Sequence, residues 1–336
     1  MDLYAELALP GPRGGTPDRR AGSVRRTATT DMVWPDGYAG GLVLEGRARD
    51  LYTPAVGEPV VLDAAVTRVA IGDARTITAI AAVPTRDGIE GLVGAQGGTY
   101  LRGAIDDVLP GEREAATALH LLLDDVAGCS LIAGFVWSRF DPDFRERMRA
   151  NTPNFGTRKG RVICSGLRPG GFAQVTRLDP AYEGPMCAVM PVVPLATDDP
   201  WAWHELPEPA EVCMRRHRRL DVWRDGDEIV VDEQFRDSVW EPDGSEIVLH
   251  EYEVAARIDA ATGTLAAVTA SPRVLPFPEC PSAAPNAARL VGTPVRAFRT
   301  DVQQSLTELD CCTHLNDMLR CLAEVPVLAT HLPPPA

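Results

Sequence analysis

Residues 215–226 read RRHRRLDVWRDG, and this stretch decides the fold because a diverged version of it, RRTATTDMVWPDG, occupies residues 25–37. Each stretch begins with two arginines, reaches an aspartate six residues after the first arginine, and ends with a tryptophan and Asp-Gly. Internal similarity of this kind is the sequence signature of a repeated structural unit. The chain is therefore expected to contain two copies of one module.

More matched pairs follow these two stretches in the same order along the chain. They are Arg49-Asp50 with Arg236-Asp237, Val61-Leu62 with Val248-Leu249, Pro84 with Pro272, Leu92-Val93-Gly94 with Leu290-Val291-Gly292, and His120-Leu121 with His314-Leu315. These pairs place the first copy at residues 23–136 and the second at residues 213–328. Residues 1–22 are expected to form a flexible N-terminus, residues 137–212 an inserted segment, and residues 329–336 a tail.

Each copy is expected to be an α+β module, a three-stranded antiparallel sheet followed by helices. β-branched and apolar runs bounded by turn residues predict strands near 42–51, 59–71 and 76–83, and at 228–237, 246–258 and 264–270. Apolar residues at helical spacing predict helices near 99–108 and 114–126, and at 283–291, 295–306 and 313–323, the last capped by Thr313. Because a three-stranded sheet leaves its edges unpaired, the two copies are expected to associate as a pseudo-dimer.

The inserted segment, residues 137–212, has no counterpart in either copy and is too long for a plain linker. Two interpretations stay open. The segment is either a packed connector that covers a sheet edge or a lid over a pocket, since long loops in compact proteins often cover or form sites.

The charge of the chain limits its partners. Lys and Arg number 33 against 47 Asp and Glu, which gives a formal net charge of −14. Such a chain repels phosphate backbones and anionic lipid surfaces, so neither nucleic acid nor a membrane is an expected partner. A small-molecule substrate or a partner protein is expected instead, and the oligomeric state stays open.

The sequence also bears on localisation. The apolar stretch 186–195 is broken by two prolines and is shorter than a membrane-spanning helix. The N-terminus lacks the basic and apolar regions of a secretory signal. The chain is therefore expected in the cytoplasm, where cysteines are thiols or metal ligands rather than disulfides.

Residues suited to metal binding occur in the second copy. His250 lies in a predicted strand, Cys280 in a proline-rich loop, and Cys312 and His314 at the start of the last predicted helix, with Cys311 as an alternative to Cys312. Cysteine and histidine are common ligands of zinc and iron. The first copy has Asp63 and Ala118 at the matching places and lacks the Cys280 loop, so one site per chain is expected.

Other interpretations of these residues remain. Cysteines near an apolar helix are commonly buried thiols. Alternatively Cys312, with His314 beside it, is a catalytic thiol whose pKa the helix N-terminus lowers. Arginines that could bind an anionic substrate are Arg215, Arg216, Arg296 and Arg299.

Cys311-Cys312-Thr313-His314-Leu315 resembles the G-C-T-H-L motif with which an uncharacterised bacterial domain family ends, with Cys-Cys here in place of Gly-Cys. The family's R-R-x-D-G pattern, its V-H-D-M strand and its proline-rich stretch with one cysteine correspond to Trp223–Gly226, Leu249–Tyr252 and Pro276–Pro281. The resemblance covers residues 215–325. It implies the boundaries of a module rather than a reaction.

The second copy is also distantly similar to iron–sulfur scaffold proteins of the NifU/IscU type. The shared features are a strand with a polar ligand, a loop cysteine, and a cysteine at the start of the last helix, here His250, Cys280 and Cys311 or Cys312. In those proteins such residues bind zinc or a cluster, so this similarity implies a carrier.

Three functions are consistent with the sequence. The first is a metal-dependent enzyme that acts on a small anionic or aromatic substrate. The second is a metal or iron–sulfur carrier, and the third is a structural or assembly protein without catalysis. The sequence contains no Walker loop, G-x-G-x-x-G fingerprint, G-x-S-x-G elbow or H-E-x-x-H pair, so no nucleotide cofactor is expected.

Overall fold

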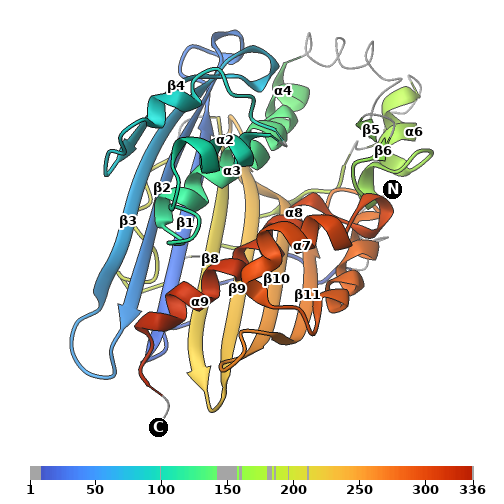
Figure 1. Ribbon diagram of the computed structural model, residues 1–336. Helices are drawn as coiled ribbons and strands as arrows, with labels where there is room; N and C mark the ends of the chain where they lie inside the picture. The colour runs from blue at the N-terminus through green and yellow to red at the C-terminus, as the bar shows by residue number, and fades with distance from the viewer. Residues whose placement is uncertain are drawn as a thin grey trace.

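One large antiparallel sheet dominates the computed structural model, which describes residues 9–98, 100–141, 157–158, 161–179, 184, 187–195, 197–209 and 212–334 (Figure 1). The strands on its main path are β1 (Ser23–Val33), β2 (Leu42–Thr53), β3 (Val60–Ile71), β4 (Ile77–Val83), β8 (Cys213–Asp225), β9 (Glu228–Trp240), β10 (Glu246–Asp259) and β11 (Leu265–Val274). Their spatial order is β11-β10-β9-β8-β1-β2-β3-β4. Two consecutive four-strand meanders thus meet edge to edge in the middle of the sheet.

The central pair, β1 and β8, was not among the predicted strands, so the prediction of three strands in each half is wrong by one. These strands are rich in arginine and threonine, and nearly every residue in them is buried. These strands therefore lack the alternation of apolar and polar residues that predicts a strand. Because buried arginine is rare, arginine in a sequence indicates an exposed position. The two strands pair antiparallel, with Arg25 opposite Asp221 and Asp31 opposite Arg215.

Helices cover one face of the sheet, which we call the helical face (Figure 1). Over the first half lie α2 (Leu101–Val108), α3 (Ala118–Ile132) and α4 (Gly134–Phe140), and over the second α7 (Phe298–Ser305), α8 (Thr313–Cys321) and α9 (Val325–Leu328). The structure is thus α+β, as expected. The predicted helix at 283–291 is instead a 3-10 helix, η6 (Cys280–Leu290), with Pro285 inside it. Thr313 is the first helical residue and Cys312 the N-cap.

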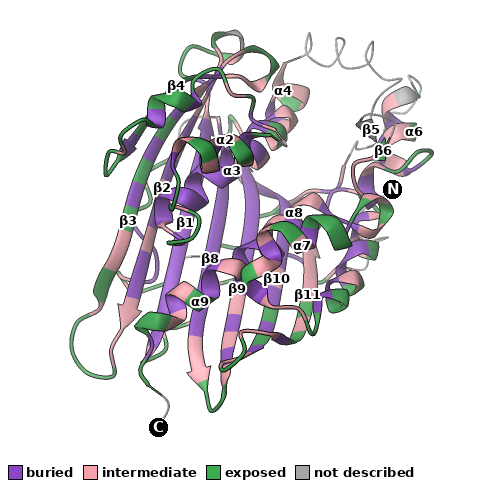
Figure 2. Ribbon diagram, viewed as in Figure 1, coloured by how far each residue is buried: buried purple, intermediate pink, exposed green. Residues whose placement is uncertain are grey.

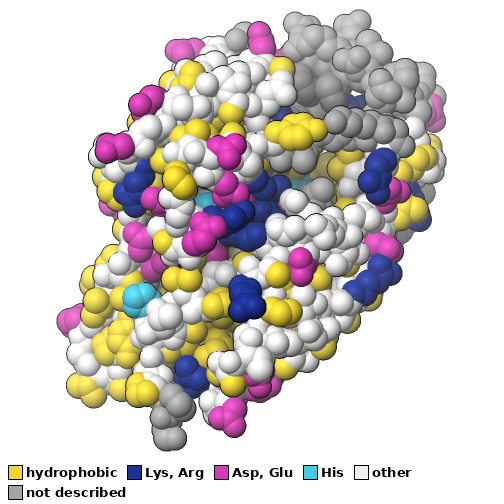
Figure 3. Space-filling view, in the orientation of Figure 1, with side chains coloured by type: hydrophobic (Ala, Val, Ile, Leu, Met, Phe, Trp, Pro, Cys, Tyr) yellow, Lys and Arg dark blue, Asp and Glu magenta, His cyan; other side chains and the backbone are white. Residues whose placement is uncertain are grey.

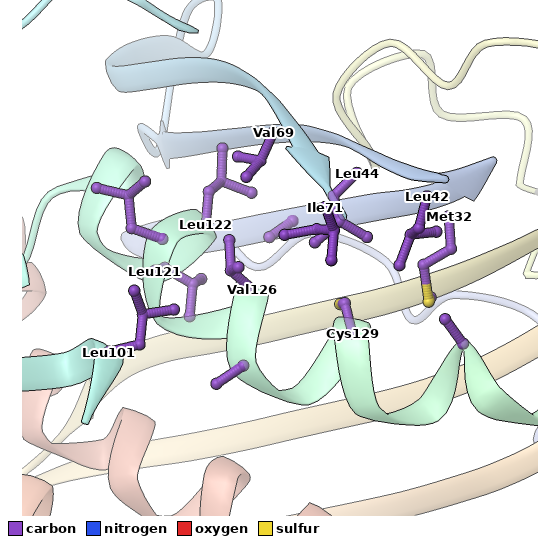
Figure 4. Packing of buried hydrophobic residues seen from close by; sticks show 14 of the residues in the cluster. Met32, Leu42, Leu44, Val69, Ile71, Leu101, Leu121, Leu122, Val126 and Cys129 are labelled. Carbon is purple, nitrogen blue, oxygen red and sulfur yellow. The ribbon is translucent and has the colours of Figure 1, made fainter. Parts of the chain in front are cut away.

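The helical layers bury two hydrophobic cores against the sheet (Figure 2). In the first core, side chains of α3 interlock with those of the strands below; the labelled residues are Met32, Leu42, Leu44, Val69, Ile71, Leu101, Leu121, Leu122, Val126 and Cys129 (Figure 4). Burying a large aliphatic side chain contributes about 1.5–3 kcal/mol. The cores therefore fix both helical layers relative to the sheet.

The stretch Ala118–Phe140, which contains α3 and α4, is long and apolar enough to cross a membrane by length and composition. Within it, 72% of the most apolar window is buried inside the protein. Core helices of globular proteins are commonly as long and as apolar as this stretch.

The opposite face, which we call the loop face, is covered by residues 9–22, 187–195 and 197–209. Residues 9–22, predicted to be flexible, are instead bonded to the sheet and the inserted segment: the amide of Arg13 donates to Glu251, and Thr16 donates to the carbonyl of Leu195. Part of the inserted segment forms β7 (Met190–Pro191), which pairs with β10. Residues 194–195 and 197–206 cover a cavity. The inserted segment thus has a feature of each expected role, since it pairs with a strand of the sheet and also covers a cavity.

Smaller elements complete the described structure. They are β5 (Thr157–Arg158) and β6 (Arg161–Val162), which pair with each other, α6 (Phe172–Leu178), and the 3-10 helices η1 (Tyr38–Gly40), η2 (Asp73–Arg75), η3 (Ile89–Leu92), η5 (Ser165–Leu167), η7 (Val295–Ala297), η8 (Glu308–Asp310), η9 (Leu322–Glu324) and η10 (Ala329–His331). Residues 1–8 of the predicted flexible N-terminus lie outside the described residues.

Candidate metal centre

Three side chains with metal-ligating atoms converge on the helical face of the second half. Asp237 on β9 and His250 on β10 are register partners, and His314 is the second residue of α8. One ligand atom from each lies within 4.8 Å of the other two. The register shifts by one residue at Leu249, directly before His250. A bulge of this kind re-aims the next side chain, here toward Asp237 and α8.

The two imidazoles of this group lie near the same carboxylate oxygen. Nδ1 of His250 lies 3.5 Å from Oδ2 of Asp237, and Nε2 of His314 lies 3.8 Å from the same oxygen. Both distances exceed ordinary hydrogen bonds. Nδ1 of His250 is buried and has no hydrogen-bond partner among the described residues. A buried polar atom without a partner is costly, so the group has an unused ligand atom at its centre.

Arg216 on β8 fixes the carboxylate of this group. Its Nε donates to Oδ1 of Asp237 at 2.9 Å and its Nη2 to Oδ2 at 3.1 Å. Its Nη1 donates to Asp125 of α3 at 3.3 Å. A Cβ on Gly128 would come within 2.4 Å of Nη1, so glycine at this place in α3 makes room for the guanidinium. Each carboxylate oxygen has about two lone-pair directions, so the Arg216 fork leaves Asp237 able to bind a cation.

The protonation states suit metal binding. Burial lowers the pKa of His250, against the opposing effect of Asp237. Burial and the neighbouring His250 lower the pKa of His314 well below its ordinary value. Burial alone would raise the pKa of Asp237, but Arg216 and the histidines hold it below its usual range. At neutral pH the group therefore consists of one carboxylate and two neutral imidazoles, the forms that bind metals.

The two imidazoles are stacked. Their ring centroids lie 3.7 Å apart and their planes differ by 25°. A metal ion lies close to the plane of each imidazole that binds it, and stacked planes do not meet near the ligand atoms. Binding of one ion by both histidines therefore requires their rings to tilt away from the stack.

The predicted cysteine donors lie close by, on the far side of His314. Sγ of Cys312 is 3.9 Å from Nδ1 of His314, the nitrogen that does not face Asp237. Sγ of Cys311 instead donates to the carbonyl of Ile163. Cys280 is buried, with its sulfur against Gly166 of η5. The structure thus brings His250 and His314 together, and Cys312 next to one of them.

These cysteines are held as thiols. Burial raises the pKa of Cys312, although the amides of Leu315 and His314 at the helix start oppose the shift. Burial likewise raises the pKa of Cys311 to about 12, and that of Cys280 well above its usual value. The expected lowering of the Cys311 or Cys312 pKa by the helix N-terminus is therefore not found, because desolvation outweighs the backbone dipoles.

The predicted substrate-binding arginines have carboxylates of the protein as partners, with one exception. Arg215 pairs with Asp31 through two hydrogen bonds. Arg216 holds Asp237, as described, and Arg299 contacts Asp124 of α3 and Glu324. Arg296 is exposed on η7.

A network of buried ion pairs links the two helical layers beside the metal-ligand group. Arg218 holds Asp125 with two hydrogen bonds of 2.7 Å, and Arg320 reaches Asp124 at 3.0 Å. Arg26 reaches Glu324 across the same boundary. Figure 3 shows basic and acidic side chains gathered side by side in the middle of this face. Ion pairs at this boundary fix the position of α8, which carries His314.

The matching place in the first half has the same fork and different ligand atoms. Arg26 holds Asp50 as Arg216 holds Asp237, with Nε and Nη2 on the two oxygens. Asp63 is the register partner of Asp50, and its Oδ2 accepts from the amide of Ala118 at the start of α3 at 2.8 Å. Among the described residues only the second half brings three such ligand atoms together.

Asp237 was not among the predicted ligands. It was identified in the sequence only as half of the repeated Arg-Asp pair. The signal that could have found it is the register of the β9–β10 hairpin, because the turn at Gly244 together with the register shift at Leu249 places Asp237 opposite His250.

Comparison with protein families places this group within a known domain. Residues 214–328 match the model of a family described as "Protein of unknown function (DUF2889)". The matched segment begins in β8 and ends with α9, so it contains all three ligand residues. This agrees with the expected resemblance to an uncharacterised family. No curated protein and no solved structure matched the chain.

Proposed function

We propose that this protein is a metal-dependent enzyme with one metal centre per chain, formed by Asp237, His250 and His314. The observation that carries the proposal is the convergence of three ligand atoms within 4.8 Å, on the buried Asp237 and His250 and the partly buried His314. A pair of histidines with one carboxylate is a donor set used by both iron and zinc enzymes, and it leaves coordination positions open for substrate. Zinc or iron is therefore the proposed metal.

The chain's own residues have separable roles at this centre. Arg216 orients the Asp237 carboxylate and balances its charge, while Cys312 contacts the outer nitrogen of His314 and sets the ring position. Groups that support ligands in this way tune metal sites strongly. A bound divalent cation would supply Lewis acidity and lower the pKa of a coordinated water.

Access for a substrate is proposed from the side of His314. Its side chain is 16% exposed, whereas that of Asp237 is 0% exposed and that of His250 6%. A small anionic or aromatic molecule is the proposed substrate class.

We also infer that the two halves are diverged copies of one module. In both halves four strands are followed by a 3-10 helix, η3 or η6, and then by α-helices, of which α2 and α3 correspond to α7 and α8. The central ion pairs are reciprocal, since Arg25 bonds to Asp221 at 2.6 Å and Arg215 bonds to Asp31. Two-fold related modules produce such reciprocal contacts. The register shifts at Leu62 and at Leu249 also correspond.

A turn after the fourth strand of each half supports the same inference. Gly94 and Gly292 both have positive φ, 91° and 88°, and their amides donate to Ile77 and Leu265, the first residues of β4 and β11. Both distances are 2.8 Å. Only glycine adopts this backbone conformation at low cost. Two halves of unrelated origin would each have had to acquire the same glycine turn independently.

The alternative proposal is a metal or iron–sulfur carrier, as the similarity to scaffold proteins implies. A carrier must present its ligands to a partner protein. The burial of Asp237 and His250, and the thiol form of the cysteines, favour the enzyme.

The test is metal analysis of the protein purified without a histidine tag or chelator. One equivalent of zinc or iron per chain is expected. His314→Ala should remove it, while His120→Ala, the matching change in the first half, should leave it in place.

A chain with no bound metal after reconstitution with either ion would contradict the proposal. A stoichiometry of two, or loss of metal in His120→Ala, would contradict the assignment of one centre to the second half.

A further inference from the structure

A cavity of about 400 Å³ lies on the loop face, on the other side of the sheet from the metal-ligand group. Residues 194–195 and 197–206 of the inserted segment form one wall, and β8, β9 and β10 form the other. Because side chains alternate along a strand, neighbouring residues of one strand lie on opposite faces of the sheet. Arg215 and Arg236 line the cavity, while Arg216 and Asp237 belong to the metal-ligand group.

An imidazole without a partner lies in this cavity. His217 is 7% exposed, and its Nδ1 makes no hydrogen bond with the described residues. Burial and the nearby Arg215 and Arg236 lower the pKa of His217 well below its ordinary value, so the ring is neutral and carries one N–H. His217 lines the cavity, and a buried polar atom without a partner calls for an explanation such as a missing ligand or water.

Arg215 supplies a second open polar group. Its Nε and Nη2 bond to Asp31, and Nη2 also bonds to the carbonyl of Pro207. Its Nη1 makes no hydrogen bond with the described residues. Because the fork on Asp31 fixes the guanidinium, this donor is held in place before a ligand arrives, which reduces the entropy cost of binding.

The remaining walls are aromatic and apolar. The rings of Trp203 and His217 meet edge to face at 5.8 Å, and the guanidinium of Arg215 lies over the Trp240 ring at 5.1 Å. Pro194 and Leu206 also line the cavity. Pockets of this volume with aromatic walls and a few polar groups are typical of small-molecule sites.

We propose that this cavity binds a small aromatic monocarboxylate, with the carboxylate on Arg215 and His217 and the ring between Trp203 and Trp240. The charge balance favours a single negative charge. Asp31 already pairs with Arg215 and Glu251 with Arg236, and Glu246 is in the lining. A dianion such as phosphate would meet too little positive charge. Burial raises the pKa of Glu246, which reduces its repulsion of an anion.

The test is calorimetric titration of the full chain with benzoate, cyclohexanecarboxylate and benzyl alcohol. Benzoate is expected to bind one to one, and the two probes that lack the ring or the charge at least tenfold more weakly. His217→Leu and Trp240→Leu should each weaken benzoate about tenfold or more, as expected for loss of a hydrogen bond to a charged group or of an aromatic contact. Trp223→Leu, a half-buried strand tryptophan outside the cavity, is the matched control.

If His217→Leu fails to fold, Glu246→Gln at the partly exposed side of the cavity replaces it and should tighten benzoate binding at pH 8, where the native carboxylate is ionised. No binding of benzoate at millimolar concentration, or equal affinities in all variants, would overturn the proposal. Titration in the presence of a chelator keeps it separate from the metal centre, since benzoate binding should persist without metal.

Discussion

The two halves of the molecule contain the same arginine–aspartate fork and differ in what surrounds it. In the first half Arg26 holds Asp50, and the register partner Asp63 binds the start of α3. In the second half Arg216 holds Asp237, and the register partner is His250, stacked on His314. The fork alone thus serves the fold. The group of metal-ligating atoms is found in the second half, where His250 takes the place of Asp63, the carboxylate that binds the start of α3.

The largest expected effect comes from removing the carboxylate of each fork. Asp237→Ala and Asp50→Ala each leave a buried arginine without its main partner, so each should lower the free energy of unfolding by about 3–5 kcal/mol. Only Asp237→Ala should also abolish metal binding. Urea denaturation and metal analysis of the pair measure both effects. If Asp50→Ala lost the metal too, the halves would not differ as described.

Acid should destabilise the metal-free protein through histidines of both halves. Burial lowers the pKa of His120 to about 3, and those of His250 and His314 are also lowered. Unfolded histidines take up protons below pH about 6.5, while the folded ones stay neutral, so stability is lost as the pH falls. The loss is about 1.4 kcal/mol per pH unit for each histidine, down to the folded pKa.

Denaturation curves at pH 7, 6 and 5 test this expectation. His120→Gln and His314→Gln should each make the pH dependence shallower by one histidine. Stability that stays constant from pH 7 to 5 would mean that these rings are protonated in the folded protein.

A smaller effect is expected at the helix starts. Cys312→Ser and Ala118→Ser each place a hydroxyl at a matched, buried position, with an expected loss of about 1–3 kcal/mol. In Cys312→Ser one metal per chain should remain, bound more weakly, because His314 loses a contact. Thermal denaturation and metal titration measure the pair. Complete loss of metal in Cys312→Ser would make the thiol a ligand.

The smallest expected effect is that of Asp63→Asn. The amide keeps the hydrogen bond to Ala118 but removes a negative charge from the start of α3, which should lower stability by about 0.3–1 kcal/mol. Metal content should not change. A thermal melt at low and high salt checks the electrostatic origin, since added salt should reduce the difference between variant and native protein.

Much of the outer sheet could be predicted from the sequence. The strands β2, β3, β4, β9, β10 and β11 carry β-branched residues bounded by turns, and their predicted positions are close to those found. The central strands β1 and β8 could not be predicted, because their arginines are buried in ion pairs with carboxylates of other segments. These arginines are Arg25, Arg26, Arg215 and Arg216. A buried charge is recognised only when its partner is known, and the partner is a property of the tertiary structure.

The candidate site was likewise predicted in part. His250 and His314 were singled out by residue type, and the structure brings them together. Asp237 was missed, since an aspartate next to an arginine has no local pattern that marks a ligand. The pKa values of the cysteines were misjudged because burial, which raises them, cannot be read from their position at a helix start.

The register of β1 against β8 makes each of these strands complementary to itself. In an assembly of two second halves, Arg215 of one would meet Asp221 of the other, and the same holds for Arg25 and Asp31 in two first halves. The pairing of β1 with β8 therefore does not discriminate between a first half and a second half as the partner. Discrimination is left to the contacts that are not reciprocal, chiefly Asp125 of α3 with Arg216 and Arg218. These contacts, and not the pairing of β1 with β8, therefore decide which halves recognise each other.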